Sequence, residues 1–394
     1  MPIIDHEPAL RDFSSADHNR KIELFRVADE RFQKLTEKYI TAVLAGKVPQ
    51  SAAGQKPNEE MGLVLRELNK QRAHMPIRKL VQGIPTLLPK LKPCLLMSPL
   101  SVAQYLDASH ASFDVVVFDE ASQIPVWDAV GAIARGKQLV VVGDPKQLPP
   151  TNFFNRADDD ETNGDMADAQ PIKDLESILD ECLGAGLPTL RLEWHYRSRH
   201  ESLITFSNHR YYDSRLITFP SPVTKDMAVK LRLVSGIYDR GATRTNRVEA
   251  DAIVAEILAH FTDENRRKQT IGVVTFNQTQ QRLIETLLDE ELRKAPQLEH
   301  HMNEHGPEKL FIKNLENVQG DERDVILFSV TYGKDAAGRM AMNFGPLNQE
   351  GGHRRLNVAI TRARVGVTIF SSIRPEEIDL SRTRAAGVTD LKNY

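Results

Sequence analysis

Two short apolar runs, each followed by acidic residues, constrain the fold of this chain most strongly. Val115–Phe118 runs into Asp119 and Glu120, and further along Leu139–Val142 leads to Asp144. Unbroken runs of β-branched and aromatic residues predict strands that are buried within a parallel sheet. The carboxyl ends of neighbouring parallel strands meet at one edge, where ligands bind in open α/β folds. We therefore expect these carboxylates to lie together in a cleft.

The residue types at this edge suit phosphate chemistry. Asp119 offers an oxygen ligand to Mg²⁺, a small hard ion that keeps part of its water shell. The adjacent Glu120 is placed to position an attacking water. Gln147 follows the second run together with Asp144, and its amide can sense a terminal phosphate. The four side chains predict a site for hydrolysis of a nucleoside triphosphate.

Composition indicates an ordinary globular chain. The 394 residues are 41% hydrophobic and 27% charged, with a formal net charge of −3, so two or three domains are expected and overall disorder is excluded. No apolar run reaches the roughly eighteen residues of a membrane span, and the N-terminus is polar. Cys94 and Cys182 are isolated, which fits a reducing compartment and offers no zinc spacing. We expect a cytoplasmic protein.

The first half predicts helices followed by alternating strands and helices. Spacing of apolar residues predicts amphipathic helices at about 18–46 and 59–74, and a first strand at 94–97. A polar, acidic segment at 155–174 reads as a loop. A helix at 175–183 then ends in a glycine-rich stretch at 184–188, which we interpret as a hinge.

The second half repeats this alternation, and the whole predicts an α/β fold with two parallel-sheet domains. The expected domains are a helical segment at 1–90, the remainder of a first domain at 91–188 and a second domain at 189–394. Strands are expected near 231–234, 271–275, 325–330 and 367–370, with helices at about 246–261 and 278–292.

Five segments, in this order, resemble the motifs of superfamily 1 helicases, particularly the branch similar to nonsense-mediated-decay RNA helicases. The resemblance covers roughly residues 94–372. Its segments are Asp119–Ser122, Gly143–Pro150, Trp194–Ser198, Val318–Val325 and Leu356–Arg364. Stretches at 75–78, 95–101 and 378–384 also look like the motor core of large bacterial multidomain helicases, some of which carry a nuclease-like domain.

The resemblance implies two RecA-like domains, the first incomplete at its N-terminus, that hold ATP and Mg²⁺ between them. It assigns Asp119 to the metal, and the catalytic set would be Asp119, Glu120, Gln147, Arg197 and Arg362. Residues implied to bind the nucleotide are Tyr196, Gly320, Glu322 and Asp144, with the tyrosine stacked on adenine. Candidate nucleic-acid contacts are Ser98, Ser101, Thr275, Asn277, Asn314 and Gln319, because short polar groups at strand ends can bond phosphates without reading bases.

Arg362 lies in a Thr-Arg-Ala-Arg run that we expect to be helical. An arginine that neutralises transition-state charge is worth roughly 10³ to 10⁵ in rate in related phosphoryl transfer. Arg364 would then point to a different side of the helix and serve a structural or nucleic-acid role.

The chain contains no Gly-x-x-x-x-Gly-Lys-Ser/Thr phosphate loop. The nearest match, at 131–138, ends in glutamine and leads into a strand, whereas a phosphate loop follows a strand and opens a helix. We expect the sequence to be a fragment that alone binds ATP poorly, from a parent that hydrolyses ATP. The parent would move along single-stranded nucleic acid, DNA favoured and RNA possible, in the 5′ to 3′ direction that the resemblance suggests.

Two other functions remain open. One is a P-loop ATPase that remodels a substrate other than nucleic acid, although it would not need the segments at 318–325 and 356–364. The other is a non-catalytic clamp on DNA or RNA. Retention of Glu120, Gln147, Arg197 and Arg362 together argues against such a clamp.

Overall fold

The computed structural model describes residues 6–49, 59–107, 113–150, 176–221 and 228–394. The acidic segment predicted at 155–174 lies outside these ranges. The chain divides into two compact units, residues 1–116 with 130–139 and residues 117–129 with 140–394.

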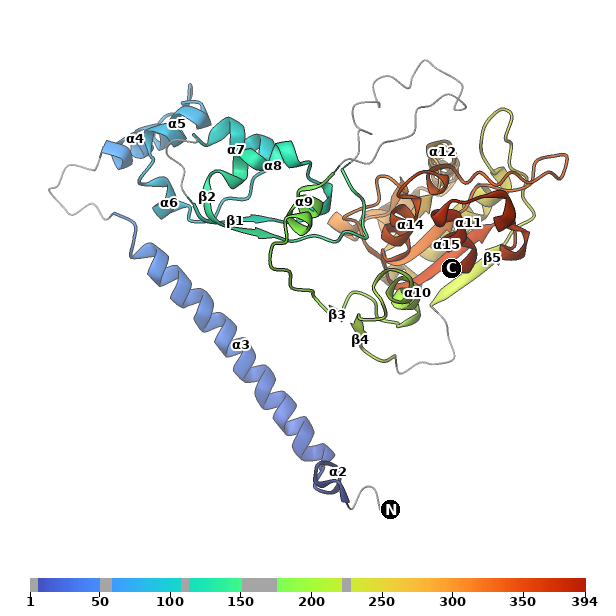
Figure 1. The fold of residues 1–394 in the computed structure, drawn as a ribbon, viewed down its shortest axis with the longest axis horizontal. Helices are drawn as coiled ribbons and strands as arrows, with labels where there is room; N and C mark the ends of the chain where they lie inside the picture. Colours follow the sequence, from blue (N-terminus) through green and yellow to red (C-terminus); the bar gives the residue numbers. More distant parts are fainter. Residues whose placement is uncertain (1–5, 50–58, 108–112, 151–175, 222–227) are drawn as a thin grey trace. The chain divides into compact units, whose positions relative to one another are not determined.

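The first unit is mainly helical (Figure 1). The 31-residue helix α3 begins after Ser14, whose side chain accepts a hydrogen bond from the Asp17 amide at 3.4 Å, and none of its residues is buried. The predicted helix at 59–74 exists but ends at Leu68. The helices are α2 (Pro8–Arg11), α3 (Ser15–Ala45), α4 (Glu59–Leu68), α5 (Ile77–Gly83), α6 (Leu88–Leu91) and α7 (Pro99–Tyr105).

The strand predicted at 94–97 is wrong. These residues form an irregular segment between α6 and α7, in which Leu96 is 96% exposed. Pro93 and Pro99 flank the segment, and proline cannot donate to a strand ladder. Within the described ranges, no strand pairs with residues 94–97.

The two predicted apolar strands are present. They are β1 (Phe113–Phe118) and β2 (Gly136–Val141), which pair with each other and are joined by the 3₁₀ turn η1 (Ala121–Gln123) and helix α8 (Val126–Ile133). The Phe113 amide donates to the Arg135 carbonyl, and the Val142 amide donates to the Phe118 carbonyl. The residue numbers of the partners rise together on both strands, so the pair is parallel. Full burial was wrongly predicted, since Val117 remains 60% exposed.

The false phosphate loop at 131–138 spans the end of helix α8 and the start of strand β2. It therefore runs from helix to strand, which is the reverse of the order that a phosphate loop requires. This confirms the interpretation from sequence.

The second unit contains a five-stranded parallel sheet in the order β5-β9-β8-β6-β7, which confirms the predicted α/β class (Figure 1). Predicted strand 271–275 matches β6 in both bounds. The strands are β5 (Val229–Leu233), β6 (Ile271–Thr275), β7 (Phe311–Asn314), β8 (Arg323–Ser329) and β9 (Ala363–Ser371). A separate parallel pair joins β3 (Trp194–His195) to β4 (Ile217–Thr218).

Helices cover both faces of this sheet. Alternate residues of its strands therefore pack into two different hydrophobic clusters. Leu327 packs in a cluster with Ile253 and Ile284, whereas Phe328 packs in a second cluster with Leu356. The helices of this unit are α9 (Ile178–Gly184), α10 (Ser202–Tyr211), α11 (Arg247–Thr262), α12 (Gln278–Lys294), α13 (Pro296–Asn303), α14 (Gly352–Ile360) and α15 (Ala386–Asn393). Short 3₁₀ turns are η3 (Arg266–Lys268), η4 (Gly306–Glu308), η5 (Gly345–Asn348), η6 (Pro375–Glu377) and η7 (Leu380–Arg382).

The expected helical setting of the Thr-Arg-Ala-Arg run is wrong. Helix α14 ends at Ile360 and strand β9 begins at Ala363, so Arg362 lies in the turn between them. Arg364 is a strand residue. The backbone of Arg362 also donates to Ala359 and accepts from Arg323, which fixes this turn against the start of β8.

Candidate functional site

The carboxyl ends of β1 and β2 bring two acidic segments together within the second unit. The Ala121 amide donates to Val142 at 3.0 Å, and the Val142 amide donates to Phe118 at 2.8 Å. Gly143 favours a close approach at the second strand end, because a Cβ there would lie 3.1 Å from the backbone nitrogen of Ser122 and 3.2 Å from that of Ala121. The close approach sets the Asp119 segment directly beside the Asp144 segment.

Glu120 adopts a left-handed backbone conformation, with φ 52° and ψ 39°. Few residues other than glycine adopt it, and strain of this kind concentrates at functional sites. Oδ1 of Asp119 accepts a hydrogen bond from the Glu120 amide at 3.0 Å and supports the turn. Both carboxylates are exposed, so they are accessible to solvent and ligand.

Asp144 holds its own loop and reaches a distant tyrosine. Its Oδ1 accepts from the Lys146 amide at 2.9 Å. Its Oδ2 accepts from Nε2 of Gln147 at 3.1 Å and from the hydroxyl of Tyr212 at 2.7 Å. Asp144 is thus occupied by protein donors, and the predicted direct role in nucleotide binding remains untested.

Gln319 lies between the predicted water-positioning carboxylate and the predicted phosphate sensor. Its Nε2 lies 3.4 Å from Oε2 of Glu120 and 3.5 Å from Oε1 of Gln147. Its Oε1 is buried and has no partner in the part of the chain that the structure describes. The sequence interpretation assigned Gln319 to nucleic acid, whereas the structure places it beside Glu120.

Arg197 is held by Glu322, whose Oε2 accepts from its Nε at 2.6 Å. A second contact joins a terminal nitrogen of Arg197 to the carbonyl of Thr361 at 3.5 Å. About a third of each ion-paired side chain is exposed, so the pair is open to competition from another anion. The predicted nucleotide contact of Glu322 stays a prediction.

Arg362 is only 3% exposed. Its Nε donates to the Val358 carbonyl at 2.7 Å, and a terminal nitrogen donates to Oγ1 of Thr361 at 3.1 Å. Burial, reinforced by the positive charge of Arg197, lowers the pKa of Arg362 to about 10, while Glu120 opposes the shift. The guanidinium therefore stays charged at neutral pH, and it lies within electrostatic reach of Glu120.

The remaining predicted nucleotide contacts lie on the surface. Tyr196 is 85% exposed, so its ring has a face available for stacking. Gly320 has φ 86° and open space around its Cα, which is a backbone position that suits glycine. Neither observation tests the predicted roles.

The other nucleic-acid candidates have local structural contacts. Oγ of Ser98 caps α7 and bonds Ser101. Thr275 is buried and donates to the Asn277 carbonyl at 2.8 Å. Asn277 caps α12 through a 2.7 Å bond from Gln280, and Asn314 accepts from the Glu316 amide at 3.1 Å. Their nucleic-acid roles stay predictions.

Arg364 stabilises the strand ends of the second sheet. Its guanidinium contacts Glu308 at 2.6 Å, Asp324 at 3.1 Å and Oγ1 of Thr270 at 3.0 Å. Of the two roles considered from sequence, these contacts support the structural one.

Tyr212 is the site residue that sequence reasoning missed. It follows helix α10 directly, and nothing in the spacing of residues 202–218 links it to Asp144. Its hydroxyl also accepts from Nδ2 of Asn357 at 3.0 Å, and the same nitrogen donates to the Lys146 carbonyl at 2.9 Å. Hydrogen bonds between residues so far apart in the chain leave no local pattern in the sequence.

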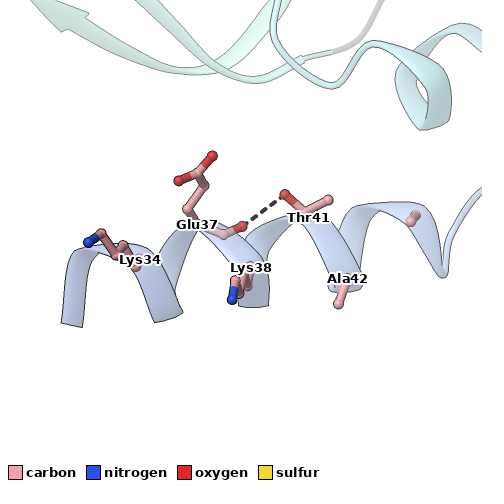
Figure 2. A pocket seen from close by; sticks show the side chains of 6 residues that line it. Lys34, Glu37, Lys38, Thr41 and Ala42 are labelled. Atoms are coloured by element: carbon pink, nitrogen blue, oxygen red, sulfur yellow. Dashed lines mark hydrogen bonds between the residues drawn. The ribbon is translucent and has the colours of Figure 1, made fainter. Parts of the chain in front are cut away.

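A shallow hollow outside this site lies along a single helix of the first unit. Its walls come only from α3, where Oγ1 of Thr41 donates to the Glu37 carbonyl at 2.8 Å (Figure 2). Side chains from one helix do not converge on a ligand, so we do not place a site there. Within the described ranges, no helix is long and apolar enough to cross a membrane, and no three His, Cys, Asp or Glu side chains gather as a metal site.

Comparison with known families identifies the family of this chain. Two models, each described as an AAA domain, match residues 95–154 and 175–374, and the second alone spans just over half the chain. The chain belongs to the AAA-domain family of superfamily 1 helicases. The resemblance drawn from the five motifs is confirmed.

Helicase relatives in curated collections are much longer than this chain. "Uncharacterized ATP-dependent helicase MG140" from Mycoplasma genitalium is 34% identical over 315 residues, which are 78% of this chain and 27% of the relative. "Regulator of nonsense transcripts 1 homolog" from Arabidopsis thaliana is 27% identical, over 68% of this chain and 20% of the relative. "Probable helicase senataxin" from Homo sapiens is 26% identical, over 66% and 9% respectively.

Among solved structures, a helicase described as Arterivirus nonstructural protein 10 matches 83% of this chain and 59% of its own, with 11% identity and a TM-score of 0.32. The structure of the PRRSV helicase matches 68% of this chain and 36% of its own, with 14% identity and a TM-score of 0.30.

Proposed function

We propose that this superfamily 1 helicase segment is the motor part of an enzyme that hydrolyses ATP to move along single-stranded nucleic acid. The observation that carries the proposal is the contact of Gln319 with both Glu120 and Gln147. Side chains from three separate motifs meet there. The charged guanidinium of Arg362 also interacts electrostatically with the Glu120 carboxylate, which opposes the lowering of the arginine pKa by burial.

The residues fit the chemistry of γ-phosphate transfer to water. Glu120 accepts the proton as the water oxygen bonds the γ-phosphorus, and the bond from that phosphorus to the β,γ-bridging oxygen breaks. Arg197 and Arg362 supply positive charge where the transferring phosphoryl group needs it. Gln147 offers an amide that senses the terminal phosphate, and Gln319 offers one that holds the water in line.

Arg197 would be redirected when the nucleotide binds. In the structure, its guanidinium is neutralised by Glu322 at 2.6 Å. Triphosphate oxygens compete with a carboxylate for the same bidentate donors. Release of Glu322 would leave its carboxylate free to contact the nucleotide, as the resemblance implies.

Asp119 fits a role as the Mg²⁺ ligand, because it is an exposed carboxylate at a strand end and Mg²⁺ prefers oxygen donors. When bound, Mg²⁺ would neutralise charge on the β- and γ-phosphates. The phosphate loop is absent from these 394 residues, so we assign turnover to a protein that carries the loop in addition. The chain alone should bind ATP weakly.

Single-stranded nucleic acid is the proposed track, with DNA favoured over RNA and movement from 5′ to 3′. The names of the relatives support nucleic acid in general, since they include an ATP-dependent helicase and a regulator of nonsense transcripts. A cytoplasmic location and a nuclease-like domain in the same protein belong to the same proposal. Backbone contacts would supply most of the grip on the strand.

ATP hydrolysis by the complete protein, with and without single-stranded DNA or RNA, tests this proposal. Glu120→Gln should lower kcat by at least about 10²-fold, because it removes the proton acceptor. Asp114→Asn is the matched control, because Asp114 lies on the same strand with 92% of its side chain exposed. Hydrolysis that nucleic acid does not stimulate would favour a remodelling ATPase, and binding that survives without any hydrolysis would favour a clamp.

A further inference from the structure

Tyr212 joins two parts of the second unit through its hydroxyl group. The hydroxyl donates to Oδ2 of Asp144 at 2.7 Å and accepts from Nδ2 of Asn357 at 3.0 Å. The first partner follows strand β2, and the second lies on helix α14, three residues before its last residue. The phenol is therefore bonded on both sides.

We propose that Tyr212 is a positioning residue for ATP hydrolysis, which acts by holding Asp144 and through it Gln147. The inference rests on the proposed function. It adds a residue outside the five motifs, and it assigns Asp144 a role in orienting the amide rather than in contacting the nucleotide.

The bonds around Asp144 determine which way the Gln147 amide faces. An ionised carboxylate only accepts, so the nitrogen of Gln147 must face Oδ2 of Asp144, 3.1 Å away. Oε1 of Gln147 then faces Nε2 of Gln319, at 3.5 Å. The amide nitrogen keeps a second N–H that Asp144 does not use. Fixing Asp144 therefore fixes the orientation of the Gln147 amide, which faces Gln319.

The same phenol connects this amide to the arginine turn. Asn357 uses one nitrogen to donate to Tyr212 and to the Lys146 carbonyl, and the Asn357 carbonyl accepts from Oγ1 of Thr361 at 2.9 Å. Oγ1 of Thr361 is in turn bonded by Arg362. A displacement of helix α14 would thus change the positions of Gln147 and Arg362 together.

The backbone holds the phenol in place. Asp213 and Ser214 both have left-handed backbone conformations, with φ 55° and 57°, and the Ser214 amide donates to Asn208 at 2.9 Å. Burial and the charge of Asp144 raise the pKa of Tyr212. The hydroxyl therefore remains protonated and able to donate at neutral pH.

The neighbouring tyrosine provides a matched control. Tyr211 donates to Oδ2 of Asp390 at 2.8 Å, a bond of the same type and length. That aspartate lies on helix α15 and is also paired with Arg210 at 2.7 Å. Tyr211→Phe removes an equivalent bond without touching Asp144.

The experiment compares Tyr212→Phe with Tyr211→Phe in the complete protein, with ATP turnover measured at saturating single-stranded DNA. Tyr212→Phe should lower kcat by about tenfold or more, since small displacements of positioning groups are costly, and change KM for ATP by less than about twofold. Tyr211→Phe should leave kcat within about twofold. Equal losses in the two variants, or an unchanged kcat for Tyr212→Phe, would overturn the inference.

Amide hydrogen exchange of the 394-residue chain supplies a readout that is independent of turnover. Tyr212→Phe should speed exchange at Lys146, whose amide is held by Asp144, and Tyr211→Phe should not. Wild-type protein without turnover would refute the proposed function itself. An active wild type whose Tyr212→Phe variant keeps full kcat would refute only the role of Tyr212.

Discussion

Nε2 of Gln319 lies 3.4 Å from Oε2 of Glu120, although 199 residues separate them in the sequence. The contact joins the loop before strand β8 to the end of strand β1. It places an amide group beside the carboxylate that we propose to accept the proton of the attacking water. The predicted role of Gln319 in nucleic-acid binding and this role at the hydrolysis site lead to different kinetics.

Gln319→Ala should lower kcat of the nucleic-acid-stimulated ATPase by about tenfold, because one group that orients the water is lost. The single-strand concentration that gives half-maximal stimulation should stay unchanged. Steady-state kinetics with a titration of single-stranded DNA measures both quantities. Gln281→Ala is the control, because that amide donates to Glu285 on the same helix at 3.0 Å. A raised half-maximal concentration with unchanged kcat would restore the nucleic-acid role.

Glu249 should make the second unit less stable as pH rises. It is fully buried, and Oε1 accepts from Ser329 and from the Thr331 amide at 2.6 and 2.7 Å. Burial raises its pKa from 4.5 to about 8. Between these values the folded protein keeps a proton that the unfolded chain releases, so the contribution of Glu249 to stability is greatest below pH 4.5 and falls by about 1.4 kcal/mol per pH unit up to about pH 8.

Glu249→Gln should abolish this dependence, because the amide keeps the acceptor oxygen and does not ionise. Urea unfolding at several values between about pH 5 and pH 8 measures the slope. Asp251→Asn on the same helix, where the side chain is 51% exposed, should leave the slope in place. Parallel pH profiles for wild type and Glu249→Gln would contradict a protonated Glu249.

Arg364→Ala should lower the free energy of unfolding by about 2 kcal/mol, because Asp324 and Thr270 lose a partner in a setting where only 20% of the arginine side chain is exposed. Arg247→Ala is the comparison. Its pair with Asp251 is 62% and 51% exposed, and such pairs contribute at most about 1 kcal/mol. Urea midpoints that shift equally would show that the network around Arg364 adds nothing beyond a surface pair.

Gly143→Ala should lower both stability and ATP turnover. The added Cβ would lie 3.1 Å from the backbone nitrogen of Ser122, so the two strand ends must separate by a few tenths of an ångström. A cost of about 1–3 kcal/mol is typical of such overpacking. Gly184→Ala, where nothing lies within 4 Å of the added Cβ, should keep the wild-type melting temperature or raise it. Unchanged melting of Gly143→Ala would show that the strand ends have room to move.

Long or strongly apolar elements could be predicted from the sequence, and short ones could not. Strand β6 matched in both bounds because its five residues are all buried. Strand β7 was missed because it is short and carries Lys313 and Asn314. The strand prediction at 94–97 was wrong because the apolar residues there have no neighbouring strand in the described structure. Strand pairing depends on the tertiary fold, which a local pattern does not record.

Part of the predicted grouping follows from the sequence for a similar physical reason. The Asp119 and Asp144 segments lie side by side because the parallel strands β1 and β2 share an edge. The bonds from Tyr212 to Asp144 and from Gln319 to Glu120 depend on how distant loops pack, and no periodicity records them. The setting of Arg362 was misjudged because helix α14 stops two residues before it.

The left-handed backbone of Glu120 is unfavourable for folding stability, although the side chain is the one that we propose for catalysis. A non-glycine residue in this conformation costs on the order of 1 kcal/mol, and glycine would relieve that cost. Glu120→Gly should therefore melt higher than the wild-type protein, while it abolishes ATP hydrolysis because the proposed proton acceptor is lost. Selection for stability alone would favour glycine at this position, so a carboxylate in this turn fits the catalytic role that we propose for Glu120.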